Sequence, residues 1–132
     1  MIVDTSAIVA VLLDEAHAEP LVEILSSTTD LKMSAATAVE LNAVLTRRVR
    51  PEDQRRVERL LGVWEIELVP FDAAQAGTAS QAYRDFGRGS GHPAALNLGD
   101  CYSYALAVVA GEPLLFVGDD FVHTDVMAAY RP

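Results

Sequence analysis

The stretch MIVDTSAIVAVLL, residues 1–13, joins a short apolar segment to the start of a helix. Its first three residues predict a buried strand, and the side chains of Asp4, Thr5 and Ser6 are of the kind that begin helices. Asp4 carries the only charged side chain among these thirteen residues and directly follows the predicted strand. It therefore lies where open parallel α/β sheets bind their ligands, at the carboxyl end of a strand.

The same alternation of strand and helix continues along the chain. Further strands are predicted at 31–33, 66–69 and 113–118, and further helices at 17–26, 35–48, 51–64, 73–86 and 98–110. Asp72 and Gln75 form a capping-box pattern before the helix at 73–86. Strands that alternate with helices predict an α/β fold with a central, mostly parallel sheet covered by helices on both faces.

Composition places the chain among folded proteins. The 132 residues are 51% hydrophobic and 22% charged, which suffices for a core, and residues 1–132 are expected to form a single domain. The longest stretches without Asp, Glu, Lys or Arg have 11 residues, against about 20 for a membrane span. One cysteine, Cys101, permits no internal disulfide, so we expect a protein without a membrane segment in a reducing, cytoplasmic location.

Acidic residues fall at one end of the predicted sheet. Glu40 lies among apolar neighbours on the helix at 35–48, where a carboxylate needs either a partner such as Arg47 or Arg48 or a metal ion. Asp100 opens the apolar helix at 98–110, and Asp119 with Asp120 follows the last predicted strand. Each acid taken alone is explained by a helix cap or a turn. Together with Asp4 they predict a shared site, in which carboxylates that repel one another hold Mg²⁺ or Mn²⁺.

Four segments, in order, resemble the PIN domain, and in particular VapC-type toxin ribonucleases. They read MIVDTSAIVAVLL, VELNAVL, LNLGDCYSYALA and PLLFVGDDFVHTD, and they span nearly the whole chain. The resemblance implies a magnesium-dependent endoribonuclease, with Mn²⁺ as a candidate substitute, from a bacterial toxin-antitoxin module. It also implies a VapB-type antitoxin that blocks the enzyme, an RNA substrate and a homodimer.

Carried over residue by residue, the resemblance assigns the catalytic, metal-binding acids to Asp4, Glu40 and Asp100. The fourth acid falls on Asp119 or Asp120, and we favour Asp119 because it lies nearer the strand end. Further candidates of lower rank are Thr5, Ser6 and Asn97. The mechanism implied is attack by metal-activated water on the phosphodiester bond, without a covalent intermediate, leaving a 5′-phosphate and a 3′-hydroxyl.

The basic residues are gathered in one segment of a chain whose net charge is −9. Six of the nine arginines lie within residues 47–59, which hold three acids. Candidate contacts to RNA or to a protein partner are Arg47, Arg48, Arg55, Arg56 and Arg88, the last of these in the glycine-rich loop GRGSG at 87–91. The alternative for the segment 47–59 is a solvated helix whose arginines pair with its own acids.

Two other classes of protein share some of these features. A receiver domain has a similar length and clustered acids, but it needs a lysine after its fifth strand, and the only lysine here is Lys32. The other alternative is a PIN-like module that binds metal and serves as an interaction domain without turnover.

Overall fold

The computed structural model describes residues 1–131, which contain one four-stranded sheet. Its strands are β1 (Ile2–Val3), β2 (Lys32–Ser34), β3 (Glu67–Val69) and β4 (Leu114–Leu115), in the spatial order β3-β2-β1-β4. All three strand pairs are parallel. The predicted parallel α/β sheet is therefore confirmed.

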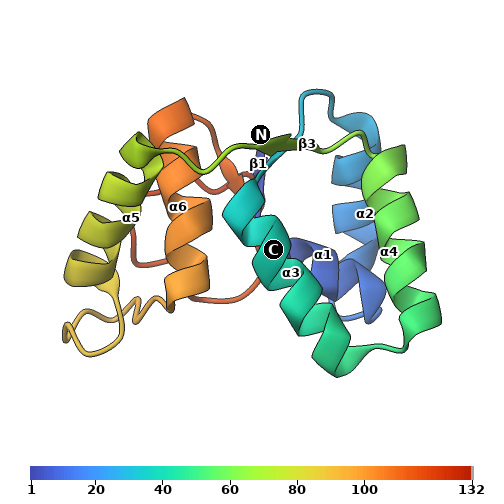
Figure 1. The fold of residues 1–132 in the computed structure, drawn as a ribbon, viewed down its shortest axis with the longest axis horizontal. Coiled ribbons are helices and arrows are strands. Elements are labelled where there is room, and N and C mark those ends of the chain that lie inside the picture. Colours follow the sequence, from blue (N-terminus) through green and yellow to red (C-terminus); the bar gives the residue numbers. More distant parts are fainter. Residues whose placement is uncertain (132) are drawn as a thin grey trace.

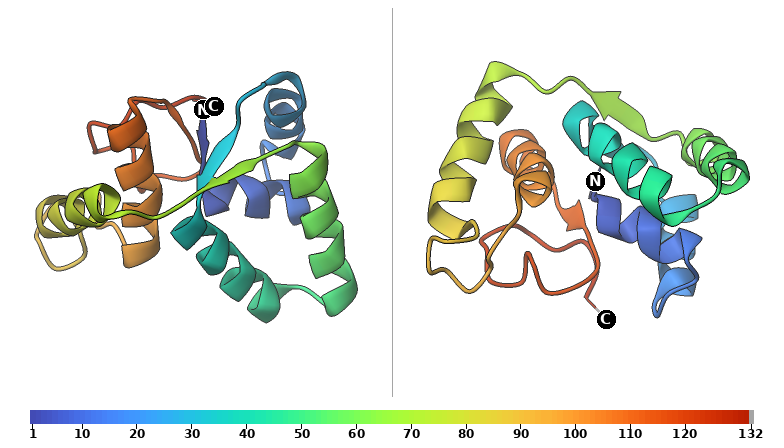
Figure 2. Two further views of the ribbon diagram at one scale, coloured as in Figure 1. Left: turned by 45° about the horizontal axis from the view of Figure 1, so that its top comes forward. Right: turned by 60° about the horizontal axis from the view of Figure 1, so that its bottom comes forward.

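Six helices surround the sheet within the same residues. They are α1 (Thr5–Leu12), α2 (Ala18–Ser27), α3 (Ala35–Arg48), α4 (Pro51–Val63), α5 (Ala73–Phe86) and α6 (Leu98–Ala110). Helices α5 and α6 lie together on one side, and α1 to α4 lie on the other, in Figure 1 and in both views of Figure 2. No helix in this part of the chain combines the length and the hydrophobicity that a bilayer crossing requires.

Alternating side chains of the two central strands, β1 and β4, pack into the hydrophobic cores on both faces of the sheet. Ile2 and Leu114 pack in the cluster that includes α5 and α6 residues, whereas Val3 and Leu115 pack in the cluster that includes residues of α1 to α4. All four are fully buried. Successive side chains of a strand point to opposite faces, so two consecutive apolar residues are enough to join the two layers.

Local side-chain chemistry sets most helix starts where the sequence predicts them. Ser34 Oγ accepts a hydrogen bond from the Ala36 backbone N–H at 3.2 Å, and Pro51 is the first residue of α4. The capping box predicted at Asp72 and Gln75 forms only in part. Asp72 Oδ1 accepts from the Gln75 N–H at 2.9 Å, but the Gln75 side-chain amide donates to the Pro70 carbonyl instead of accepting from Asp72.

The last strand is shorter than the predicted 113–118. Pairing with β1 ends at Leu115, after which the chain leaves the sheet and the Val117 N–H donates to Ser6 Oγ at 3.1 Å. Gly118 then turns the backbone with φ +97°, a conformation that favours glycine. The apolar run predicts burial correctly for Leu114, Leu115 and Phe116, but the residues after Leu115 do not pair as a strand.

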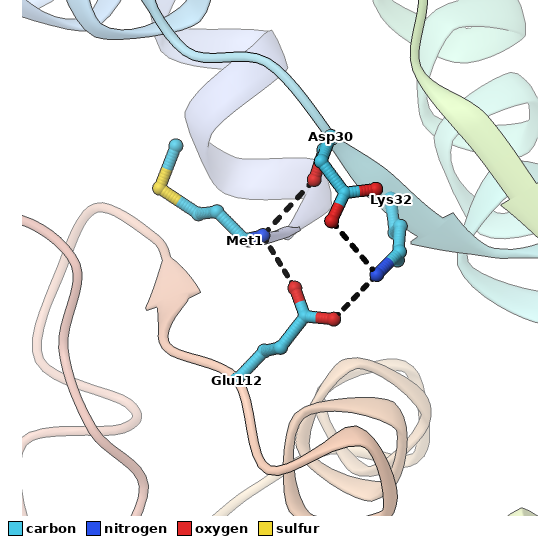
Figure 3. Close-up of polar contacts among 4 residues, drawn as sticks. All are labelled: Met1, Asp30, Lys32 and Glu112. Carbon is cyan, nitrogen blue, oxygen red and sulfur yellow. Dashed lines mark hydrogen bonds and ion pairs between the residues drawn. The ribbon is translucent and has the colours of Figure 1, made fainter.

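An ion-pair cluster fastens the opposite, amino end of the sheet (Figure 3). Glu112, just before β4, accepts from the Met1 ammonium and from Lys32 Nζ, each at 2.5 Å, and Lys32 Nζ also donates to Asp30 at 3.2 Å. The two cations hold the pKa of Glu112 below its ordinary value. The cluster thus links β1, β2 and β4 at their amino ends, whereas the predicted site acids lie at the opposite end of the sheet.

Candidate functional site

A cavity of about 340 Å³ lies at the carboxyl ends of β1 and β4. It brings together the predicted acids Asp4, Glu40, Asp100 and Asp120. A fifth acid that also lines it, Glu15, was not among the acids predicted from the sequence. The other residues that line it are Thr5, Ser6, Val9, Val44, Arg48, Asn97, Val117 and Gly118. Segments far apart in the sequence therefore place their carboxylates around one space, as the strand ends predicted.

Asp4 is both the cap of α1 and the most enclosed acid of the cavity. Only 4% of its surface is exposed. Its Oδ2 accepts from the Ser6 N–H at 2.9 Å and from Ser6 Oγ at 2.6 Å, and its Oδ1 accepts from Ser103 Oγ at 2.6 Å. Asp4 therefore both caps a helix and lines the acidic cavity, two roles that the sequence offered as alternatives.

Two buried hydroxyls that sequence reasoning missed complete the support of Asp4. Ser103 Oγ donates to the Asp4 carboxylate, so its remaining contact, Thr37 Oγ1 at 3.1 Å, must be the donor to Ser103. Ser103 and Thr37 are fully buried, on α6 and α3. The sequence signal that could have found them is their spacing from the acids. Ser103 follows Asp100 by three residues and Thr37 precedes Glu40 by three, which places each hydroxyl on the same helix face as the acid.

Glu40 does not pair with either arginine considered from the sequence. Thr5 Oγ1 donates to Glu40 Oε2 at 3.3 Å, and no ion pair involves Glu40 among residues 1–131. Burial raises the pKa of Glu40 above its ordinary value, and the negative charge of Asp4 adds to the increase. The carboxylate also lies against Gly99, where a β-carbon would overlap it.

Asp100 is the third residue of α6, and its cap is Asn97. Asn97 Oδ1 accepts from the Asp100 N–H, and Asp100 Oδ2 accepts from the Asn97 N–H, each at 2.8 Å. These two hydrogen bonds form a complete capping box. Burial raises the pKa of Asp100 from 3.8 to about 7. The charges of Asp4, Asp120 and Glu40 add to this increase, and the Asn97 hydrogen bond opposes it.

The geometry separates the two acids that follow β4. Asp120 lines the cavity and its charge acts on Asp100, whereas Asp119 is not among the lining residues. Both acids follow Gly118, which has φ +97°. The preference for Asp119, which rested on its nearness to the strand, therefore moves to Asp120.

The donor set suits a hard divalent cation, since carboxylate oxygens are the ligands that Mg²⁺ and Mn²⁺ prefer. The side chains as placed do not close around one, because no three His, Cys, Asp or Glu residues in positions 1–131 form a group that could hold an ion. Their oxygens accept hydrogen bonds from Ser103, Ser6, Thr5 and the Asn97 backbone instead. The chemistry of the residues fits a cation, because four carboxylates share one partly buried space.

The candidate arginine contacts separate into two groups. Arg48 lines the acidic cavity, and it also lines, with Arg56, a second cavity of about 300 Å³. Arg47, Arg55 and Arg88 are exposed and line neither of these two cavities.

Comparisons with known proteins concern the family and the fold. The family model of the PIN domain matches residues 1–127. Ribonuclease VapC42 of Mycobacterium tuberculosis is 60% identical over 129 residues, which cover 98% of each chain. Crystalline VapC20 of the same species, a Sarcin-Ricin loop cleaving toxin, has a TM-score of 0.75 at 17% identity over 99% of this chain and 98% of its own. A toxin-antitoxin complex from Klebsiella pneumoniae has a TM-score of 0.68 at 14% identity, covering 94% of this chain and 92% of that one.

Proposed function

The chain belongs to the PIN domain family, and from this we propose that it is a magnesium-dependent endoribonuclease, the toxin of a bacterial toxin-antitoxin module. The observation that carries the proposal is the convergence of Asp4, Glu40, Asp100 and Asp120 on one cavity. Support comes from relatives named as VapC ribonucleases, which match 98% of the chain at 60% identity. The alternative of a metal-binding module without turnover has no observation in its favour.

In the proposed mechanism Asp4, Glu40, Asp100 and Asp120 would hold the cation. A bound Mg²⁺ supplies neutralisation of phosphate charge and a lower pKa for water at the site. Asp4 keeps its position because Ser6 and Ser103 hold both of its oxygens. Asp100 must be ionised to act as a ligand, so the cation would compete with a proton at this side chain, whose pKa is raised by burial.

We further propose a VapB-type antitoxin as the partner, a homodimer as the assembly and the cytoplasm as the location, where RNA substrates are available. An antitoxin is supported by the fold shared with one component of a Klebsiella toxin-antitoxin complex. A dimer is supported by exposed apolar side chains such as Val39 and Leu98. Light scattering of the antitoxin-free protein at micromolar concentration tests the dimer, and a monomer at that concentration would refute it.

The deciding experiment is cleavage of RNA by purified protein that has been freed of antitoxin. We expect cleavage with Mg²⁺ or Mn²⁺, none with EDTA, and fragments that carry a 5′-phosphate and a 3′-hydroxyl. Asp4→Asn, purified in the same way, should be inactive, because it lowers the charge of the ligand set and keeps an oxygen acceptor. Equal cleavage by parent and variant would identify a contaminating nuclease, and binding without cleavage would leave an interaction module.

A further inference from the structure

A second cavity adjoins the acidic one at Arg48, the last residue of α3. Its rim carries Arg48, Arg50 and Arg56, with Asp53 as the one acid among its lining residues. Helix α3 contributes Glu40, Val44 and Arg48 to the acidic cavity and Arg48 to the second one. Figure 1 shows α3 running away from the sheet toward its turn with α4. The two cavities therefore share Arg48 near the end of this helix.

The arginines of this cavity are mostly free of internal partners. Arg50 pairs with Asp53 at 3.4 Å, and within residues 1–131 this is the only ion pair formed by any arginine. Arg48 and Arg56 therefore have no ion-pair partner within residues 1–131, although the whole chain carries a net charge of −9. Guanidinium groups bind phosphate through paired N–H donors, so an anionic backbone matches this surface.

The position of Arg48 limits what it can bind. Arg48 follows Glu40 by eight residues on α3, which corresponds to about 12 Å along the helix axis. A phosphate at the acidic cavity would be bound through the cation that Asp4, Glu40, Asp100 and Asp120 would hold, and Arg48 would contact the ligand at a neighbouring position.

We propose that the basic cavity is a subsite for the RNA backbone, in which Arg48 and Arg56 bind phosphates that flank the one at the carboxylates. The inference rests on the proposed ribonuclease function and adds the path that the strand takes. Continuity favours RNA over an acidic protein segment, because the strand to be cut must enter or leave the acidic cavity and Arg48 lines both spaces.

The test is the salt dependence of RNA binding. Arg48→Gln with Arg56→Gln removes two charges from the cavity, and Arg59→Gln with Arg84→Gln removes two from exposed positions outside both cavities. Binding of a short fluorescent single-stranded RNA is measured in EDTA, where no cleavage is expected, over a series of salt concentrations. For the cavity pair we expect the slope of log affinity against log salt to fall by about 1.4, or about 0.7 per lost phosphate contact. The control pair should change it much less.

Each other result overturns the subsite. Equal changes in both double variants would show that only overall charge matters, and an unchanged slope in the cavity pair would show that RNA does not bind there. Unchanged RNA binding with lost inhibition by antitoxin would assign the cavity to the protein partner. Failure of the proposed function is separate, because the parent would then bind RNA and not cut it with Mg²⁺. Melting temperatures of both double variants verify that they fold.

Discussion

The carboxylate of Glu40 rests directly against the backbone of Gly99, in the space that a β-carbon at position 99 would occupy. Glu40 comes from α3 and Gly99 from the first turn of α6, one residue before Asp100. The missing side chain therefore allows two helices to bring two acids into one cavity. In this fold the glycine preceding Asp100 has a role in the acidic site and not only in the helix.

Gly99→Ala should separate stability from activity. The atoms that a β-carbon would meet belong to the end of a flexible side chain, so Glu40 should move away and the backbone should stay in place. Alanine also favours a helix over glycine by about 0.5–1 kcal/mol, so we expect no loss of melting temperature. Cleavage should fall by about 10- to 100-fold, the usual effect of disturbing a group that positions metal ligands.

The matched control is Gly77→Ala on α5, where a β-carbon meets nothing within 4 Å. It should stabilise the protein by a similar amount without changing cleavage. If Gly99→Ala cuts RNA at the parent rate, the position of Glu40 does not matter to the chemistry.

Ser103→Ala tests the buried hydroxyls behind Asp4. The variant removes the donor to Asp4 Oδ1, and leaving a buried carboxylate oxygen without its partner should cost about 1–3 kcal/mol of stability. The concentration of Mg²⁺ needed for half-maximal cleavage should rise by about 10- to 100-fold. Thr37→Val, one step further from Asp4, should act in the same direction and more weakly.

Thr46→Val serves as the control for these hydroxyl variants. Thr46 also lies on α3 and donates to the Asn42 carbonyl, but it is exposed, so the change should stay within about 0.5 kcal/mol. An unaltered Mg²⁺ requirement in Ser103→Ala would show that Asp4 does not depend on this support.

The fold was predictable where local chemistry and tertiary structure agree. Asp4 caps α1 and ends β1, so one short motif locates both elements and the first acid. The end of strand pairing at Leu115 could not be predicted from the apolar run 113–118. It depends on the turn at Gly118 and on the hydrogen bond from Val117 to Ser6 of α1, a residue far away in the sequence. Local propensity predicts that a segment is buried, and neighbouring elements decide whether it pairs.

The acids themselves were predictable, but several of their partners were not. Glu40 has Arg47 and Arg48 close by in sequence, and yet its partner is Thr5, which only the packing of α3 against α1 brings near. The choice between Asp119 and Asp120 likewise depends on a single turn. Acidic residues at the ends of predicted strands identify a site from the sequence, whereas contacts between distant segments determine its geometry.

Acid should weaken the ion-pair cluster at the amino end of the sheet. The folded pKa of Glu112 lies below its unfolded value, so its contribution to stability is present above the unfolded value and is lost as the pH falls through the folded one. Thermal melts below about pH 5 should therefore show a steeper loss of stability in the parent than in Glu112→Gln. Equal acid sensitivity of the two proteins would show that the cluster adds no pH-dependent stability.

The acidic cavity should have the opposite pH dependence when no divalent cation is present. The folded pKa values of Asp100 and Glu40 are raised above their unfolded values, so the native state binds more protons than the unfolded state. Their stabilising effect is complete below the unfolded values, near pH 4, and is lost as the pH rises through the folded value of about 7 for Asp100. In EDTA the melting temperature should fall over this interval, and Mg²⁺ should restore it, because a ligand of the folded state stabilises by mass action.

Asp100→Asn separates the two roles that this side chain combines. Asparagine keeps an oxygen that can accept from the Asn97 N–H, so the capping box is preserved while the negative charge is removed. Without cation, the variant should melt at a higher temperature than the parent near pH 7, because one of four crowded carboxylates is gone and no proton has to be bound to relieve it. The rise produced by Mg²⁺ should shrink and cleavage should be lost, because a ligand has been removed. Asn97→Ala distinguishes this from a lost cap, since it removes the side-chain oxygen that accepts from the Asp100 N–H and should lower the melting temperature with or without cation. If Asp100→Asn melts like the parent in both conditions and still cuts RNA, Asp100 is only a part of the helix cap, and the acids that bind metal lie elsewhere.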